Sequence, residues 1–436
     1  MDMQLRGGAY TGARAHPILR EPALVLIVLI AIVMPIVSAL AYPTYIHHMP
    51  TLPWEFSRLI ELPFVVSEVA VVLWAGRQGF DLAAAWRNLP RDIRIAAGVL
   101  LFAICASALL ISNNFPYSLT HSLIVVIHLI FALAVYHLAT RRSMPGPDRI
   151  VPLIAAGGAV LVVYTAWWLL TAPPPETQLY GKIEWHAALP GFISVRHFGA
   201  WYGALASVFA LRILFAERDG RIGWDHLFYC LTAAALVWSG TRAGVLALMV
   251  VVAIAMLSLR RMPSMRAIGH AAILTGIALC LAWSAIPPDD SFRLWNLDHG
   301  RITESFDAGR LLLWQLGLER WADSPLLGWG TGSFHWEVDP GFPHTQPHNV
   351  IVQFLLNWGI VGAVPAFWLI GRAIRAAHAS ALAHPEMLPL LGMAYALLVQ
   401  SLLEGMLHYP RFIMAIIVLL AQVIARAHRP ADPSAN

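Results

Sequence analysis

The chain has 436 residues, of which 58% are hydrophobic and only 12% charged, and its mean hydropathy is +0.64. These values exclude an ordinary soluble enzyme and indicate a protein whose solvent is lipid. The formal net charge of +4 gives no reason to expect a nucleic-acid partner, because the basic residues concentrate in short loops between apolar segments.

Apolar segments of membrane-spanning length recur along the whole chain, and a helix needs roughly 20 apolar residues to cross the hydrocarbon core. Twelve such segments predict an all-α, polytopic integral membrane protein. The predicted spans are 23–41, 59–76, 95–112, 119–139, 150–171, 197–215, 226–240, 243–259, 269–286, 349–371, 387–407 and 412–426. No clear cleavage site follows the first segment, so we expect it to be a retained span.

The positions of Lys and Arg predict the orientation. With the N-terminus in the cytoplasm, most of the 29 basic residues fall in inward loops, and both termini are cytoplasmic. The chain then divides into spans one to nine (1–286), a long outward loop (287–347), and spans ten to twelve with a short tail (348–436). Because the loop carries five tryptophans, we expect a folded cap at the membrane surface rather than a disordered segment.

Within this loop, residues 308–323 have the apolar spacing of an amphipathic helix, with Asp307 as its N-cap. Gly328, Gly330 and Gly332 follow the helix and predict a tight backbone path back to the membrane.

Three arginines lie where the topology predicts the outer surface. Arg242 occupies a turn between two spans, because one helix over 226–259 would be roughly 51 Å long, too long for the bilayer. Arg310 opens the loop helix, and Arg196 opens the sixth span. Each could bind an anion, or could simply be an interfacial or ion-paired arginine.

His348 follows Pro347 at the outer end of the tenth span. Because a helix N-terminus disfavours positive charge, the imidazole is expected to stay neutral and to be able to accept a proton, as a general base does. A purely structural histidine is the alternative. His344 has the i, i+4 spacing of a metal pair, but Pro347 opposes a helix across both residues and no acidic partner is evident, so we predict no metal site.

These residues point to one site. The sixth, eighth and tenth spans all run inward, so their N-termini face outward and carry Arg196, Arg242 and His348. Together with Arg310 in the loop, several positive helix ends and three arginines share one face with a base. Such a face is suited to a phosphate or pyrophosphate group at the membrane surface.

Several stretches of the sequence resemble the O-antigen ligase and polymerase superfamily. The segments 310–314, 324–334 and 348–362 are similar to the C-terminal signature of that family, and the turn 239–244 resembles its outward arginine turn. Their order and spacing together are more specific than any one of them.

The resemblance implies transfer of a glycan from undecaprenyl pyrophosphate by direct, inverting and metal-independent displacement, with no cofactor. Arg242 and Arg310 would hold the pyrophosphate, and His348 would deprotonate the acceptor hydroxyl. The anion-binding role of Arg196 rests mainly on topology. A ligase would use the lipid A-core as acceptor, on the periplasmic face of a bacterial inner membrane, and we favour a ligase because the cap carries the arginine and histidine motifs together.

Other functions remain open at this stage. A polymerase of the same superfamily would extend a carrier-linked chain, whereas the short tail disfavours the protein O-glycosyltransferases. A lipid-linked glycan transporter or flippase would use the intramembrane residues Glu68, His128 and Glu404, but the sequence has no convincing internal symmetry. A metal-dependent transferase would need acidic outward ligands that are not evident, and a passive scaffold would leave the outward arginines unexplained.

Overall fold

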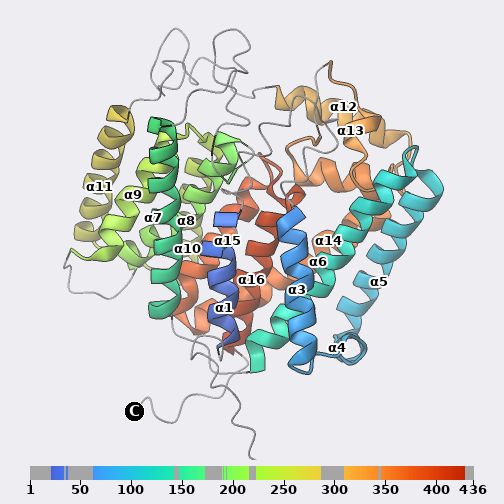
Figure 1. The fold of residues 1–436 in the computed structure, drawn as a ribbon, viewed down its shortest axis with the longest axis horizontal. Coiled ribbons are helices and arrows are strands. Elements are labelled where there is room, and N and C mark those ends of the chain that lie inside the picture. Colours follow the sequence, from blue (N-terminus) through green and yellow to red (C-terminus); the bar gives the residue numbers. More distant parts are fainter. Residues whose placement is uncertain are drawn as a thin grey trace, which may run out of the picture.

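The computed structural model describes residues 21–33, 36–37, 62–141, 147–171, 189, 191–192, 194–215, 222–285, 309–341 and 345–427. Throughout these ranges the protein is a bundle of helices packed side by side, with α12 and α13 across one end (Figure 1). Besides helices, the described part contains an isolated bridge between Leu189 and Phe192. The predicted all-α class is therefore confirmed.

Each predicted span overlaps a helix within the described residues. These helices are α1 (Pro22–Val28) with η2 (Leu29–Val33), α3 (Leu62–Arg77), α5 (Arg91–Ala106) with η4 (Ser107–Ile111), α6 (Phe115–Arg141), α7 (Pro147–Thr171), α8 (Val195–Phe215), α9 (Trp224–Trp238), α10 (Arg242–Leu259), α11 (Met265–Ser284), α14 (Val350–Ala383), α15 (Leu388–Gln400) and α16 (Pro410–Ala427). The remaining elements are α4 (Leu82–Asn88), α12 (Arg310–Ala322), α13 (Phe334–Glu337), η7 (Pro385–Met387) and η8 (Met406–His408).

Eight helices within the described ranges are long and apolar enough to cross a membrane. They are α5 with η4, α6, α7, α8, α10, α11, α14 and α16. The other four predicted spans correspond to the shorter helices α1 with η2, α3, α9 and α15. The number twelve therefore stays a prediction, although the separation of α9 from α10 confirms the hairpin that the length argument required.

Helix α8 lies at the centre of the bundle, buried along most of its length. It packs against α9, α10 and α15. Its contact with α10 is close because small residues face one another: a Cβ added to Gly203 would lie 3.1 Å from the Gly244 backbone. Small residues at such crossings let helix backbones approach in a membrane, where apolar side chains gain little by leaving lipid.

The long helix α14 is broken at Gly359, which has φ 58° and ψ −166°. A segment of the loop after α12 pairs with the break. Trp329 N–H donates to Leu356 O at 2.8 Å, and Ile360 N–H donates to Pro325 O at 2.9 Å. The loop thus satisfies polar backbone groups that the break removes from the helical ladder, as burial away from water requires.

Glycines make this pairing sterically possible. A Cβ on Gly359 would lie 2.2 Å from Leu326 O, and one on Gly328 would lie 2.5 Å from Leu356 O. Gly328, Gly330 and Gly332 all have positive φ, of 66°, 96° and 83°. The tight path predicted from these three glycines is confirmed.

Two sequence predictions about these elements need correction. The tenth span was expected to end at residue 371, but α14 continues to Ala383, because no helix-breaking residue follows until Pro385. The loop helix begins at Arg310 rather than at residue 308, and its N-cap is Gly309 in a left-handed conformation. Asp307, the predicted N-cap, lies outside the described residues.

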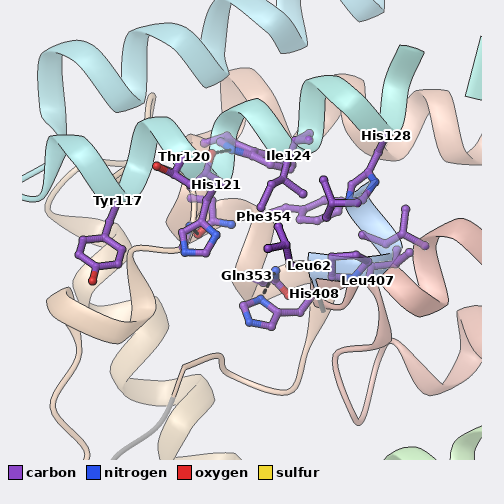
Figure 2. Close-up of a pocket in the computed structure, with 18 residues that line it drawn as sticks. Leu62, Tyr117, Thr120, His121, Ile124, His128, Gln353, Phe354, Leu407 and His408 are labelled. Atoms are coloured by element: carbon purple, nitrogen blue, oxygen red, sulfur yellow. Dashed lines mark hydrogen bonds between the residues drawn. The ribbon is translucent and has the colours of Figure 1, made fainter. Parts of the chain in front are cut away.

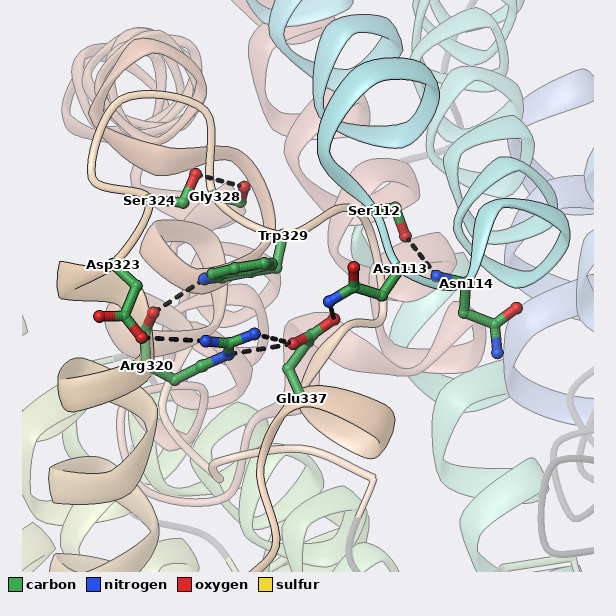
Figure 3. A network of polar contacts seen from close by, with 9 residues as sticks. All are labelled: Ser112, Asn113, Asn114, Arg320, Asp323, Ser324, Gly328, Trp329 and Glu337. Carbon is green, nitrogen blue, oxygen red and sulfur yellow. Dashed lines mark hydrogen bonds and ion pairs between the residues drawn. The ribbon is translucent and has the colours of Figure 1, made fainter.

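A polar network fixes α12 to its surroundings (Figure 3). Arg320 pairs with Glu337 of α13 at 2.5 Å and with Asp323 at 2.9 Å, and its guanidinium stacks on Trp329 at 3.6 Å. The second Glu337 oxygen accepts from Asn113 at 2.8 Å, in the turn before α6. Burial lowers the pKa of Arg320, but the bonds to Glu337 and Asp323 outweigh it, so the pKa is raised and the arginine stays charged.

We predict that Gly359→Ala destabilises the protein by about 1 to 3 kcal/mol or more. Alanine disfavours the positive φ, and its Cβ would collide with the loop. Gly371→Ala in the same helix is the matched control, since a Cβ there meets nothing within 4 Å and alanine favours helix. Apparent Tm in detergent is the measurement. Equal Tm values for the two variants would contradict a constrained break.

Candidate functional site

The segment between α15 and α16 brings an acidic side chain to the α12 end of the bundle. Helix α15 ends at Gln400, and a turn over 401–404 leads to Gly405, which has φ 64°. The expected helical span 387–407 is therefore too long, because the turn interrupts it. Val350 N–H donates to Ser401 O at 3.0 Å, which fixes this turn against the start of α14.

Glu404 in this turn forms an ion pair with Arg310, through Oε1 and Nη2. The side chains are only 4% and 14% exposed, respectively. Arg310 is thus held by a carboxylate from a segment 94 residues away in the chain. Because a buried carboxylate without a partner is costly, the pair orients both residues.

His348 lies beside the same carboxylate. Its Nδ1 is 4.0 Å from Glu404 Oε2 and 3.4 Å from the Glu404 carbonyl oxygen. A tautomer that donates Nδ1–H to this carbonyl leaves the proton-accepting lone pair on Nε2. The structure therefore brings two of the predicted site residues, Arg310 and His348, together on Glu404.

The backbone of His348 is strained, with φ 55° at a residue other than glycine. The next residue, Asn349, is the N-cap of α14, and its Oδ1 accepts from Ile351 N at 2.8 Å and Val352 N at 3.1 Å. The histidine thus sits just before the helix N-terminus, as predicted. Backbone strain of this kind is typical of functional sites.

A second layer of contacts supports the cluster. Gln346 donates to Tyr409 Oη at 2.9 Å, and the Tyr409 ring packs on His197 of α8 with centroids 4.1 Å apart. A Cβ on Gly405 would lie 1.9 Å from Gln346 Oε1, so glycine is required at that position. Tyr409 thereby connects the segment before His348 to the start of α8.

Arg196 and Arg242 lie in the first turns of α8 and α10, and these two helices start in the same region. Arg196 precedes His197, and the exposed Arg242 is the first residue of α10. The turn before Arg242 packs on α8, since a Cβ on Gly199 would lie 2.0 Å from Thr241 Oγ1. The starts of α8, α10 and α14 are thus neighbours, as their shared direction predicted.

Arg411, near the start of α16, is buried. Its guanidinium donates to the Gly191 carbonyl and lies over the rings of Phe64 and Phe192, at 4.7 and 4.8 Å from their centroids. These contacts tie the start of α16 to α3 and to the segment before α8. Arg411 therefore packs the same end of the bundle.

No three His, Cys, Asp or Glu side chains in the described parts of the chain come together closely enough to hold a metal ion. His344, considered in the sequence as a partner of His348, lies outside those parts. Asn349 is the N-cap of α14, so His348 lies before this helix. An i, i+4 metal pair needs both histidines within one helix.

The acids considered for a transport mechanism are paired with other side chains. Glu68 of α3 bonds to His128 of α6 at 2.6 Å, and both side chains are buried. Glu404 pairs with Arg310. Such partners satisfy charge or hydrogen-bonding capacity within the bundle, so burial of these acids requires no transport function.

Comparison with known families identifies the region that contains these residues. Residues 227–367 match the family described as O-antigen ligase. The match covers less than half of the chain. No curated protein and no solved structure matches the chain.

The match confirms the resemblance to the O-antigen ligase and polymerase superfamily, and it supports a membrane enzyme that transfers glycosyl groups. Arg242, Arg310 and His348 lie inside the matched residues. Arg196 and Glu404 lie outside them. Sequence reasoning missed Glu404 as a partner of Arg310, although an acid in an otherwise apolar segment was a usable signal.

We predict that Glu404→Gln lowers stability by about 2 to 3 kcal/mol, because Arg310 keeps its charge and loses its carboxylate. The double variant Arg310→Gln/Glu404→Gln should lose less than the sum of the two single variants, because it leaves neither charge unpaired. Apparent Tm values of the four proteins complete this thermodynamic cycle. Additive losses would show that the two side chains do not stabilise one another.

Proposed function

We propose that the protein is an O-antigen ligase, which transfers a polysaccharide from undecaprenyl pyrophosphate to a sugar hydroxyl of the lipid A-core. One observation carries the proposal: Arg310 and His348 share the carboxylate of Glu404. An anion-binding group and a proton acceptor thus lie next to one another at the end of apolar helices, where a lipid-linked pyrophosphate would meet an acceptor.

The donor pyrophosphate would bind to the arginines. Arg310 and Arg242 each begin a helix, and unpaired N–H groups in a first helical turn favour an anion. Arg196, at the start of α8, adds a third cation. Arginine is well suited to this task because its planar guanidinium donates several hydrogen bonds to phosphate oxygens.

The chemical step is a single displacement. His348 takes the proton of the acceptor hydroxyl, and the acceptor oxygen forms a bond to the anomeric carbon of the donor sugar. The bond from that carbon to the pyrophosphate oxygen breaks, and its electron pair leaves with the pyrophosphate. Attack opposite the leaving group inverts the anomeric configuration, and the arginines stabilise the charge that develops on the leaving group.

Glu404 has two tasks in this proposal. It holds Arg310 in place before the donor binds, and it stabilises the imidazolium that forms when His348 accepts the proton. The 4.0 Å distance between Glu404 Oε2 and His348 Nδ1 lets the carboxylate act on the charged ring. A base that is oriented by a neighbouring group is a general feature of such active sites.

The proposed location is the periplasmic face of a bacterial inner membrane, with both termini in the cytoplasm. The eight apolar helices and the family match support a membrane protein that acts on lipid-linked glycans. The distribution of basic residues supports this orientation.

We predict that His348→Ala, Arg310→Ala and Arg242→Ala each lower transfer by about 100-fold or more, because each removes the base or part of the leaving-group stabilisation. The assay is transfer of a carrier-linked O-antigen to lipid A-core in proteoliposomes. His335→Ala is the matched control, since this histidine lies in α13 outside the cluster. Extension of carrier-linked chains without transfer to the core would identify a polymerase instead, and flipping without transfer would identify a transporter.

Chelation by EDTA should leave the rate of transfer unchanged, because arginine rather than Mg²⁺ is proposed to meet the developing charge. The rate is measured in the same proteoliposomes before and after chelation and after readdition of Mg²⁺. A loss that Mg²⁺ restores would refute the assignment of that charge to the arginines.

A further inference from the structure

A cavity of about 260 Å³ lies between α3, α6, α14 and α16, and Thr331 and Gly332 of the loop are among its lining residues. Figure 2 labels ten of the residues that line it. Its outer part is lined by Tyr117, Thr120, His121, Gln353, Asn357 and His408. Its inner part is apolar and extends along α6 to His128, roughly 16 Å below Tyr117 at 1.5 Å per residue.

The polar side chains of the outer part carry hydroxyl, amide and imidazole groups. No Lys, Arg, Asp or Glu is among the described residues that line the cavity. A phosphate group bound there would lack the cations that normally hold it. Hydroxyl, amide and imidazole groups beside the rings of Tyr117 and Trp358 instead suit a neutral molecule with hydroxyl groups and apolar faces, as a sugar has.

Gln353 supplies the observation that points to a ligand. This side chain is only 6% exposed, and its amide nitrogen lies 3.0 Å from His408 Nδ1. Its Oε1 is buried and has no hydrogen-bond partner among the described residues. If the amide is assigned the other way round, its NH2 group is the one without a partner. A hydroxyl satisfies either assignment, because it both donates and accepts.

The cavity is next to the proposed transfer site. Gln353 lies in the first turns of α14, and its N–H donates to the carbonyl of Asn349, the residue after His348. His408 follows Glu404 by four residues, in η8. A sugar ring held by Gln353 would therefore lie about one helical turn from the proposed base.

We propose that this cavity is a saccharide subsite, in which Gln353 binds a neutral sugar hydroxyl of the acceptor. The proposal rests on the proposed glycosyl transfer for its link to catalysis, but binding of the sugar can be measured separately. The volume, a little below the usual range of about 300 to 1,000 Å³ for ligand pockets, suits one sugar unit. His121 and His408, on facing sides of the space in Figure 2, would bound the ring.

The first test compares Gln353→Met with Gln315→Met, the same substitution at an exposed position on α12. Loss of one neutral hydrogen bond should raise the KM for the lipid A-core acceptor about three- to tenfold in Gln353→Met, with the donor KM unchanged. Gln315→Met should leave both KM values unchanged. An unchanged acceptor KM, or a change confined to the donor KM, would overturn the subsite.

The second test measures binding without turnover. In a variant in which Cys105, Cys230 and Cys280 are replaced by Ala, Thr120→Cys places a thiol at the cavity mouth, and Gln315→Cys serves as the control. Delipidated core oligosaccharide should slow maleimide labelling at position 120 and leave position 315 unaffected. Protection by undecaprenyl phosphate alone would assign the cavity to a lipid chain, and protection by neither probe would also refute the proposal.

The two proposals can fail separately. If no transfer is detected but the oligosaccharide protects position 120, the saccharide subsite stands and the ligase reaction falls. If transfer is detected but the oligosaccharide does not protect, the ligase reaction stands and the subsite falls.

Discussion

A backbone carbonyl or an ionised side chain that is buried away from water must find its partner within the protein. The break at Gly359 and the Arg310–Glu404 pair both meet this requirement with segments distant in the sequence. The loop over 325–330 satisfies the backbone of α14, and the turn after α15 supplies the carboxylate for Arg310. The site is therefore assembled from the same contacts that satisfy these buried polar groups.

This constraint explains why α12 and the loop after it are fixed in position relative to α14 and α6. The loop that follows α12 is bonded to α14 at its break, and α12 itself is fixed to α13 and to the turn before α6 through Arg320 and Glu337. Arg310 stands at the start of α12. A displacement of α12 would thus move Arg310 relative to His348, which lies just before the start of α14.

Much of the fold could be predicted from the sequence, because lipid imposes a strong length and composition rule on each helix. The hairpin before Arg242 was confirmed for this reason, whereas the path through Gly328, Gly330 and Gly332 followed from the backbone freedom of glycine. The break in α14 could not be predicted, since Gly359 lies in an apolar run where a glycine is also compatible with continuous helix. Its conformation is set by the loop that pairs with it, which is a tertiary contact.

The candidate site was predicted in part. Helix direction placed Arg196, Arg242 and His348 at one end, and the structure brings the starts of α8, α10 and α14 together there. The pairing of Glu404 with Arg310 could not be predicted, because an ion pair across 94 residues depends on how the turn after α15 folds. Gln353 was also missed, because its proposed role rests on a buried oxygen that has no hydrogen-bond partner among the described residues.

The charge of the cluster bears on how the three arginines would share the donor. Arg310 and Glu404 together are neutral, and His348 contributes no charge before it accepts a proton. A pyrophosphate diester is doubly negative, so the cluster by itself cannot compensate the donor in a region of low dielectric constant. In the proposed mechanism, Arg196 and Arg242 on the neighbouring helix starts would supply further positive charge. On this proposal Arg310 would position the pyrophosphate beside the base, whereas Arg196 and Arg242 would compensate its charge, so the three arginines would not be interchangeable.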